Sequence, residues 1–99
     1  MTGSAHNERP DALVLHKDDD IAVVLRDVAA GERIRTLNGA DICLVDIRTA
    51  LPTGHKVAMH DMTAGHRVRK YGEIIGELTA PVVKGEHVHV HNLVSLRAR

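Results

Sequence analysis

The chain has 99 residues with 13 basic and 13 acidic side chains, so its formal net charge at pH 7 is zero. Balanced charge without a basic block argues against nucleic-acid binding, and Tyr71, the only aromatic residue, provides no platform for base stacking. No apolar stretch has the length of a membrane span or the pattern of a signal peptide, and the length predicts one domain.

The core must be built from aliphatic side chains, because the chain has neither Phe nor Trp. Such a core is only marginally sufficient at this length, so we expect a partner chain or a homo-oligomer. Cys43 is the only cysteine, which excludes an intramolecular disulfide and favours a reducing, cytoplasmic compartment. Its position between Ile42 and Leu44 predicts a small buried apolar residue.

The first residues of the chain differ in composition from the rest. Residues 1–11 are polar, which predicts a disordered tail before a folded domain at residues 12–99. Two strands are expected at the start of that domain, at residues 12–16 and at the β-branched residues 21–25, and a charged turn at 17–20 separates them.

A seven-residue pattern then occurs four times, at residues 28–34, 51–57, 62–68 and 82–88. Each copy has an apolar residue, two turn residues, a glycine, two polar residues and a β-branched residue. We expect the glycine to supply a positive φ in a turn that leads into a strand. Glycine turns at this density leave little room for helices, so the predicted fold class is all-β, built from short strands. The repetition in two halves also suggests internal pseudosymmetry.

Histidine and valine alternate through residues 87–91, before Asn92. In an extended strand this spacing places the three imidazoles on one side and the valines, facing a core, on the other. Side chains two apart on a strand are separated by roughly 6.5 to 7 Å, so neighbouring imidazoles could share an ion, whereas the outer pair, about 13 Å apart, could not. The strand alone therefore cannot supply a closed four-ligand zinc site. A row of solvated histidines on an edge strand is the alternative interpretation.

Further polar candidates follow two glycine turns. His55 and Lys56 come directly after Gly54, while Lys70 and Tyr71 precede another glycine. With the histidine row they could bind a carboxylate-bearing polyol: the lysines for the carboxylate, the phenol for hydrogen bonding and the imidazoles for hydroxyls or a metal. Each of these side chains taken singly could instead be a solvated surface group. The other histidines of the expected domain are interpreted as structural: His16, His60 and His66.

The glycine-turn repeat resembles the SAF domain, a small β-clip fold. More narrowly, four segments in this order resemble the SAF portion of the altronate and galactarate dehydratases and the similar small subunit of sulfolactate sulfo-lyase: Gly54–Ala58, Lys70–Gly72, Ile75–Gly76 and His89–Asn92. The resemblance extends from about Leu13 to Leu96. It implies a small SAF-like β-clip fold and a lyase that eliminates water from a sugar acid, or sulfite in the sulfo-lyase case, with a divalent metal that we expect to be Fe²⁺.

The resemblance also implies a much larger second domain or subunit that holds most of the catalytic machinery and the principal metal ligands. We therefore expect this chain to be the small subunit, or an N-terminal domain, of a sugar-acid dehydratase such as one acting on altronate or galactarate. Two competing hypotheses remain. The chain could be a non-catalytic SAF module that binds a carbohydrate or a metal, or a structural subunit that only positions its catalytic partner.

The same resemblance assigns roles to individual residues. His89 and His91 are expected to act in catalysis, by proton transfer or as tentative metal ligands, with His55 as a further catalytic imidazole near the substrate. His87 receives less weight, because an aromatic or other bulky residue is expected at its position in relatives. Four residues are assigned to substrate binding: Lys56, Lys70, Tyr71 and Asn92.

Overall fold

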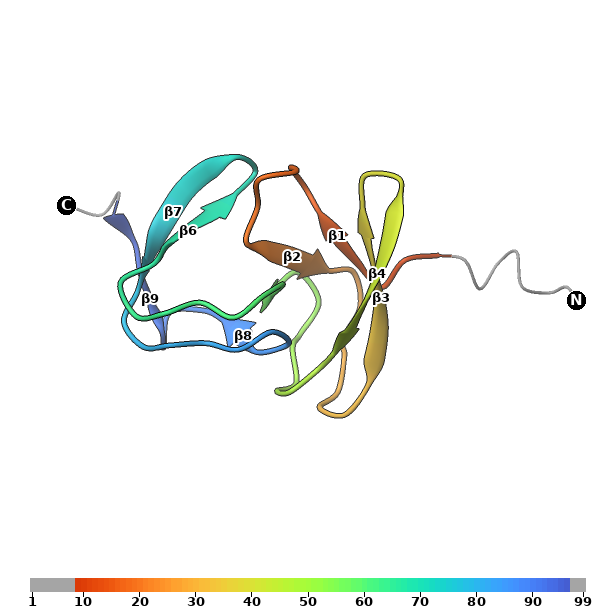
Figure 1. Ribbon diagram of the computed structural model, residues 1–99. Coiled ribbons are helices and arrows are strands. Elements are labelled where there is room, and N and C mark those ends of the chain that lie inside the picture. The colour runs from red at the N-terminus through yellow and green to blue at the C-terminus, as the bar shows by residue number, and fades with distance from the viewer. Residues whose placement is uncertain (1–8, 97–99) are drawn as a thin grey trace, which may run out of the picture.

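The computed structural model describes residues 9–96, and the structural statements below refer to that range. The prediction of an all-β fold is confirmed (Figure 1). Nine strands follow one another along the chain: β1 (Ala12–Val14), β2 (Ile21–Val24), β3 (Arg33–Asn38), β4 (Asp41–Asp46), β5 (Lys56–Ala58), β6 (Arg67–Lys70), β7 (Glu73–Leu78), β8 (His87–Val88) and β9 (Leu93–Val94). No helix within residues 9–96 combines the length and the apolar surface that a membrane crossing requires.

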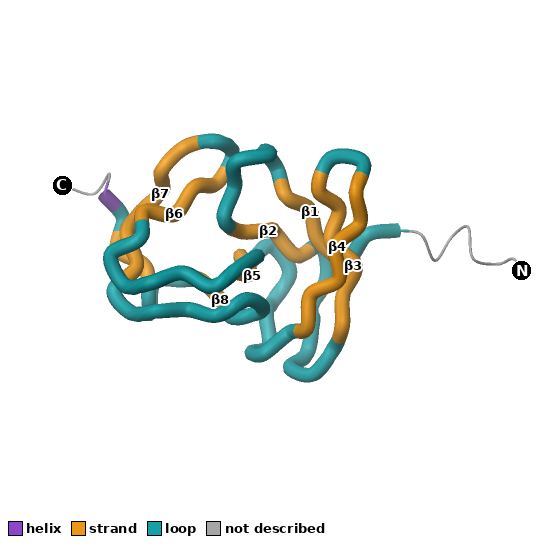
Figure 2. Tube along the Cα trace, viewed as in Figure 1, coloured by secondary structure: helices purple, strands orange, loops and turns teal. Residues whose placement is uncertain are grey.

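The strands form two sheets. One has the order β4-β3-β1-β2-β5-β8 and the other the order β6-β7-β9. Figure 2 shows β3 and β4 at one end, β6 and β7 at the other, and β2, β5 and β8 between them. Each end encloses its own aliphatic core, and β5 contributes to both, with Val57 in the first and Ala58 in the second.

The predicted pseudosymmetry is present in the backbone hydrogen bonds. In each of the four glycine turns the residue after the glycine donates its N–H to the carbonyl three positions earlier. The four glycines have φ between 86° and 94°. The turns also pair two by two: Val28 exchanges both backbone hydrogen bonds with Leu51, and Met62 does the same with Val82. One local turn chemistry therefore builds both halves of the domain.

The ends of several expected elements differ in the structure. Residues 1–8 of the predicted tail and residues 97–99 of the predicted domain lie outside the described residues. Asp11, at the predicted end of the tail, belongs to the fold, because its N–H donates to Arg35 O and its Oδ2 accepts the Arg35 N–H, both at 2.8 Å. Cys43 is half-buried and not buried as predicted, because it lies on β4, the outermost strand of its sheet.

The prediction of a strand over residues 87–91 is wrong beyond Val88. Residues 89–92 form a turn in which the Asn92 N–H donates to His89 O at 3.0 Å. Val88 is fully buried as expected, but Val90 is 81% exposed and does not face a core. The cause is the Asn92 side chain, whose amide bonds the backbone of His87 and His89 and so favours a turn over further strand pairing.

Candidate functional site

Four imidazoles meet where the start of β5 faces β8 and the turn after it: those of His55, His87, His89 and His91. The strands pair with Val57 opposite His87, and this register brings His55 toward His89. The ring centroid of His55 lies 4.6 Å from that of His89 and 5.0 Å from that of His87. His87 in turn lies 5.1 Å from His89 and 5.4 Å from His91. The shortest contact joins His55 Nδ1 and His87 Nε2 at 2.9 Å.

Two expectations about this cluster are corrected. The separation of about 13 Å inferred for the outer imidazoles assumed a straight strand. Because the chain turns after Val88, the rings of His87 and His91 are only 5.4 Å apart. His87, to which the resemblance gave less weight than to His89 and His91, lies at the centre of the cluster and contacts the other three rings. The sequence does contain a signal for this central position. Residues 54–57 and 85–88 occupy the same positions of the repeat, and each segment has a histidine shortly after its glycine.

The electrostatic surroundings of the cluster keep its central imidazole neutral. The pKa of His87 is lowered to about 4, first by burial and then by the neighbouring imidazoles and Lys56. The pKa of His89 is also lowered, by burial first and then by His55, Lys56 and His91. Among the charged groups that shift these two imidazoles there is no carboxylate. His87 and His89 therefore present unprotonated ring nitrogens, which can accept a proton or bind a metal.

The two predicted lysines come from different sheets. Lys56 begins β5 and Lys70 ends β6. Burial, with a smaller effect from Lys70, lowers the pKa of Lys56. The charge of Lys56 reaches His87 and His89, whereas the charge of Lys70 reaches Lys56 and is not among the causes of either imidazole shift. An anionic ligand would relieve the repulsion between these bases.

Tyr71 and Asn92, both assigned to substrate binding, are placed differently. Tyr71 forms the β6–β7 turn with φ 59°, is 72% exposed, and donates its N–H to Asp19 Oδ2 at 2.7 Å. No described contact joins its phenol to the imidazoles. Asn92 is 8% exposed; its Oδ1 accepts the His89 N–H at 2.9 Å and its Nδ2 donates to His87 O at 3.0 Å. In the structure Asn92 holds the histidine turn.

A small pocket opens beside the cluster. It has a volume of about 260 Å³ and is lined by His87, His91, Asn92, Thr49 and Glu86, among others. Ligand pockets usually enclose about 300 to 1,000 Å³, so this one is small for a sugar acid unless another polypeptide extends it.

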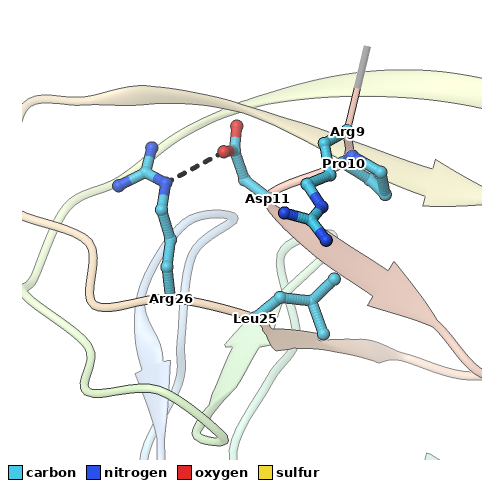
Figure 3. A pocket seen from close by; sticks show the side chains of 5 residues that line it. All are labelled: Arg9, Pro10, Asp11, Leu25 and Arg26. Carbon is cyan, nitrogen blue, oxygen red and sulfur yellow. Dashed lines mark hydrogen bonds and ion pairs between the residues drawn. The ribbon is translucent and has the colours of Figure 1, made fainter. Parts of the chain in front are cut away.

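A larger pocket, of about 410 Å³, lies near the start of β1 and is lined by Arg9, Pro10, Asp11, Leu25 and Arg26 (Figure 3). Its Arg26 guanidinium is already bound by two carboxylates, with Nε 3.0 Å from Asp11 Oδ1 and Nη2 2.9 Å from Glu32 Oε1. This pocket contains no histidine. We therefore assign the candidate site to the smaller pocket, which adjoins the imidazoles.

A second group of histidines surrounds Asp20, a residue that the sequence did not single out. His60 Nε2 lies 3.0 Å from Asp20 Oδ1, and His66 Nε2 lies 3.2 Å from Asp20 Oδ2. Burial alone would raise the pKa of Asp20, but the hydrogen bonds from Arg69 N–H, His66 and His60 lower it below 3.8. Because Asp20 joins the end of the β1–β2 loop to β6, these contacts support the interpretation of His60 and His66 as structural.

Comparison with known proteins places these observations in a family. Residues 10–96 match the family model described as the altronate/galactarate dehydratase SAF domain. The chain is 34% identical over 88 residues to the (2R)-sulfolactate sulfo-lyase subunit alpha of Chromohalobacter salexigens, covering 85% of this chain and 94% of that subunit. It is 38% identical over 78 residues to the altronate dehydratase of Escherichia coli and 32% identical over 78 residues to that of Bacillus subtilis, covering 79% of this chain in both cases. The match spans only 15% of either altronate dehydratase.

Proposed function

The chain belongs to the altronate/galactarate dehydratase SAF domain family, and on that basis we propose that it is the small subunit or N-terminal domain of a sugar-acid dehydratase. In this proposal it contributes histidines to a metal-dependent site shared with a large catalytic subunit. The observation that carries the proposal is the cluster of four imidazoles beside Lys56. The groups whose charges lower the pKa of His87 are the other three imidazoles and this lysine.

The chemistry of the substrate explains this choice of side chains. Loss of water from a 2,3-dihydroxy acid requires a base for the proton α to the carboxylate, an acid for the departing hydroxyl, and stabilisation of the negative charge that develops between these events. Lys56 and Lys70 supply two cations for the carboxylate. An unprotonated imidazole of the pair His89 and His91 takes the α proton. The hydroxyl then receives a proton from an imidazolium and leaves as water, and the new double bond remains on the acid.

The family implies a divalent metal, expected to be Fe²⁺, and the donors of this chain fit such an ion. Unprotonated imidazole is a good ligand for first-row transition metals, and ring nitrogens of His55, His87 and His89 lie within 4.8 Å of one another. When bound, the metal would stabilise negative charge on the carboxylate and hydroxyl oxygens as a Lewis acid. The large subunit would close the pocket against water and supply further ligands.

One comparison favours a second candidate function. The relative of which this chain covers 94% is a sulfo-lyase subunit, and its alignment runs over 88 residues. A small subunit of a sulfolactate sulfo-lyase would use the same bases, because the α proton and the carboxylate are common to both reactions. Only the leaving group differs, with sulfite departing in place of water.

The test is reconstitution with a large subunit copurified from the native host, followed by assays of altronate, galactarate and sulfolactate with added ferrous ion. His91→Ala and His89→Ala are each expected to lower kcat by about 10²-fold or more, the size of a general acid–base contribution. His16→Ala, an imidazole on the β1–β2 loop, is the matched control and should leave kcat unchanged. If both cluster variants keep full activity, the chain contributes no catalytic side chain and is a structural subunit. If no large subunit copurifies with the chain, a free-standing binding module is favoured.

A further inference from the structure

Three ring nitrogens of this chain lie close together. One nitrogen from each of His55, His87 and His89 lies within 4.8 Å of the others. We propose that these three imidazoles bind a divalent transition-metal ion in this chain itself, with no ligand from another polypeptide. The inference deepens the proposed function and rests on it for the use of the metal, because the large subunit would then add its ligands to an ion that this chain can hold alone.

The distances in the cluster suit an ion. Two nitrogens bound at 2.0 to 2.1 Å to the same ion lie about 2.9 Å apart at a right angle and about 3.3 Å apart at the tetrahedral angle. His55 Nδ1 and His87 Nε2 are 2.9 Å apart. The ring of His89 stacks on that of His87, with centroids 5.1 Å apart and planes 13° from parallel. One of its nitrogens lies within 4.8 Å of those of His55 and His87, near enough for a side-chain rotation to bring it to bonding distance.

The backbone that carries the three histidines is held in place. The His87 N–H donates to Thr49 Oγ1 at 3.0 Å, and its carbonyl accepts the Asn92 side chain. Asn92 also bonds the N–H and the carbonyl of His89. The His55 carbonyl accepts the N–H of Val24 at 3.0 Å. Binding an ion therefore requires side-chain rotation with little loss of backbone entropy, which favours affinity.

The donor set indicates which ions would bind. Three imidazoles without a carboxylate favour Fe²⁺, Co²⁺, Ni²⁺, Cu²⁺ or Zn²⁺ over Mg²⁺ and Ca²⁺, which prefer oxygen ligands. Three ligands leave coordination positions open for carboxylate or hydroxyl oxygens of a sugar acid. His91 lies outside the ligand set, with its ring 5.4 Å from that of His87, and is left for proton transfer. Lys56 acts against binding, because its positive charge already lowers the pKa values of two of the ligands.

The test uses the full 99-residue chain without a partner, and Co²⁺ is the probe. Binding is measured by calorimetry and by the visible absorption of the bound Co²⁺. We expect one Co²⁺ per chain and no uptake of Mg²⁺ at the same concentration. His87→Gln and His55→Gln should weaken Co²⁺ binding at least about tenfold, whereas His16→Gln should not change it. Lys56→Gln should strengthen binding by about two- to fivefold, because it removes a nearby positive charge.

Several outcomes would overturn the inference. The first is that the chain shows no saturable Co²⁺ binding. The second is that His16→Gln and His87→Gln lose Co²⁺ affinity equally, and the third is that Lys56→Gln binds Co²⁺ more weakly than the unchanged chain. Circular dichroism of each variant separates lost ligands from lost folding, and if His87→Gln does not fold, the His55→Gln variant decides. A chain that binds no Co²⁺ but supports turnover in the reconstituted enzyme refutes this inference alone. A chain that binds Co²⁺ while the reconstituted complex is inactive on all three acids refutes the proposed function and leaves the metal site.

Discussion

Gly85 differs from its three counterparts in the repeat, and that difference can be measured. Gly31, Gly54, Gly65 and Gly85 all have positive φ, but a Cβ on any of the first three would meet no heavy atom within 4 Å. A Cβ on Gly85 would lie 2.0 Å from the carbonyl oxygen of Asp46. The turn before β8 is therefore packed directly against the backbone at the end of β4. Substituting alanine at the four positions separates the conformational cost from the steric cost.

The magnitudes follow from these two terms. The left-handed backbone costs an alanine about 1 to 2 kcal/mol, and this is the full cost expected for Gly31→Ala, Gly54→Ala and Gly65→Ala. At Gly85 one backbone must also move by more than about 1 Å to restore van der Waals contact, so we expect a total of about 4 to 5 kcal/mol, at the upper end for single substitutions. That is a large part of the roughly 5 to 15 kcal/mol that stabilises a typical domain.

The assay is urea denaturation followed by far-ultraviolet circular dichroism, because the chain has no Trp to report by fluorescence. The four variants are compared by their free energies of unfolding. Failure of Gly85→Ala to fold while the other three fold would agree with the reasoning. A Gly85→Ala variant within about 1 kcal/mol of Gly31→Ala would refute it, because the close approach to Asp46 would then carry no cost.

Three further predictions concern the histidine turn and the titrating groups. Asn92→Ala removes two hydrogen bonds to the backbone of the turn and should lower the free energy of unfolding by about 1 to 3 kcal/mol. The control is Val90→Ala, which truncates an exposed side chain of the same turn and should change the free energy of unfolding by less than about 0.5 kcal/mol. Equal urea midpoints for the two variants would contradict this prediction. The pKa of His87 is lowered from 6.5 to about 4, so between these values the unfolded chain binds more protons, and the stability due to this group decreases as pH falls through that window. NMR titration of the His87 imidazole should give a midpoint near 4, and a midpoint at the ordinary histidine value would count against the burial argument. Asp20 has a lowered pKa, so its contribution is present above pH 3.8 and is lost as pH falls through the folded value; Asp20→Asn should remove that acid dependence and lower stability at pH 7 by about 1 to 3 kcal/mol, measured by urea denaturation at several pH values.

The parts of the fold that depend on local chemistry could be predicted from the sequence. Each glycine turn requires a residue that tolerates positive φ, and the four copies of the pattern identify all four turns. The β-branched run at residues 21–25 contains strand β2, which extends from Ile21 to Val24. Fold class and pseudosymmetry follow from the same two signals.

The site could be predicted only in part, because its geometry depends on contacts distant in sequence. Alternation placed His87 and His89 on one face, and their rings are indeed stacked. The same alternation could not indicate that Asn92 ends the strand through its side chain, and this turn is what brings His91 back to His87. The position of His55 depends on the pairing of β5 with β8. Strands β6 and β7 lie between these two in the chain, and no local sequence pattern indicates that they pair.

The imidazole cluster lies across the seam between the two halves of the domain. His55 follows the second glycine turn, whereas His87, His89 and His91 follow the fourth, and the pairing of β5 with β8 brings them together. A partly folded chain in which one half has formed and the other has not therefore lacks the cluster. A cation bound at this place would stabilise only the completed domain, so its concentration would set the balance between folded and unfolded chains. Assembly of the ligand set and completion of folding would then be the same event.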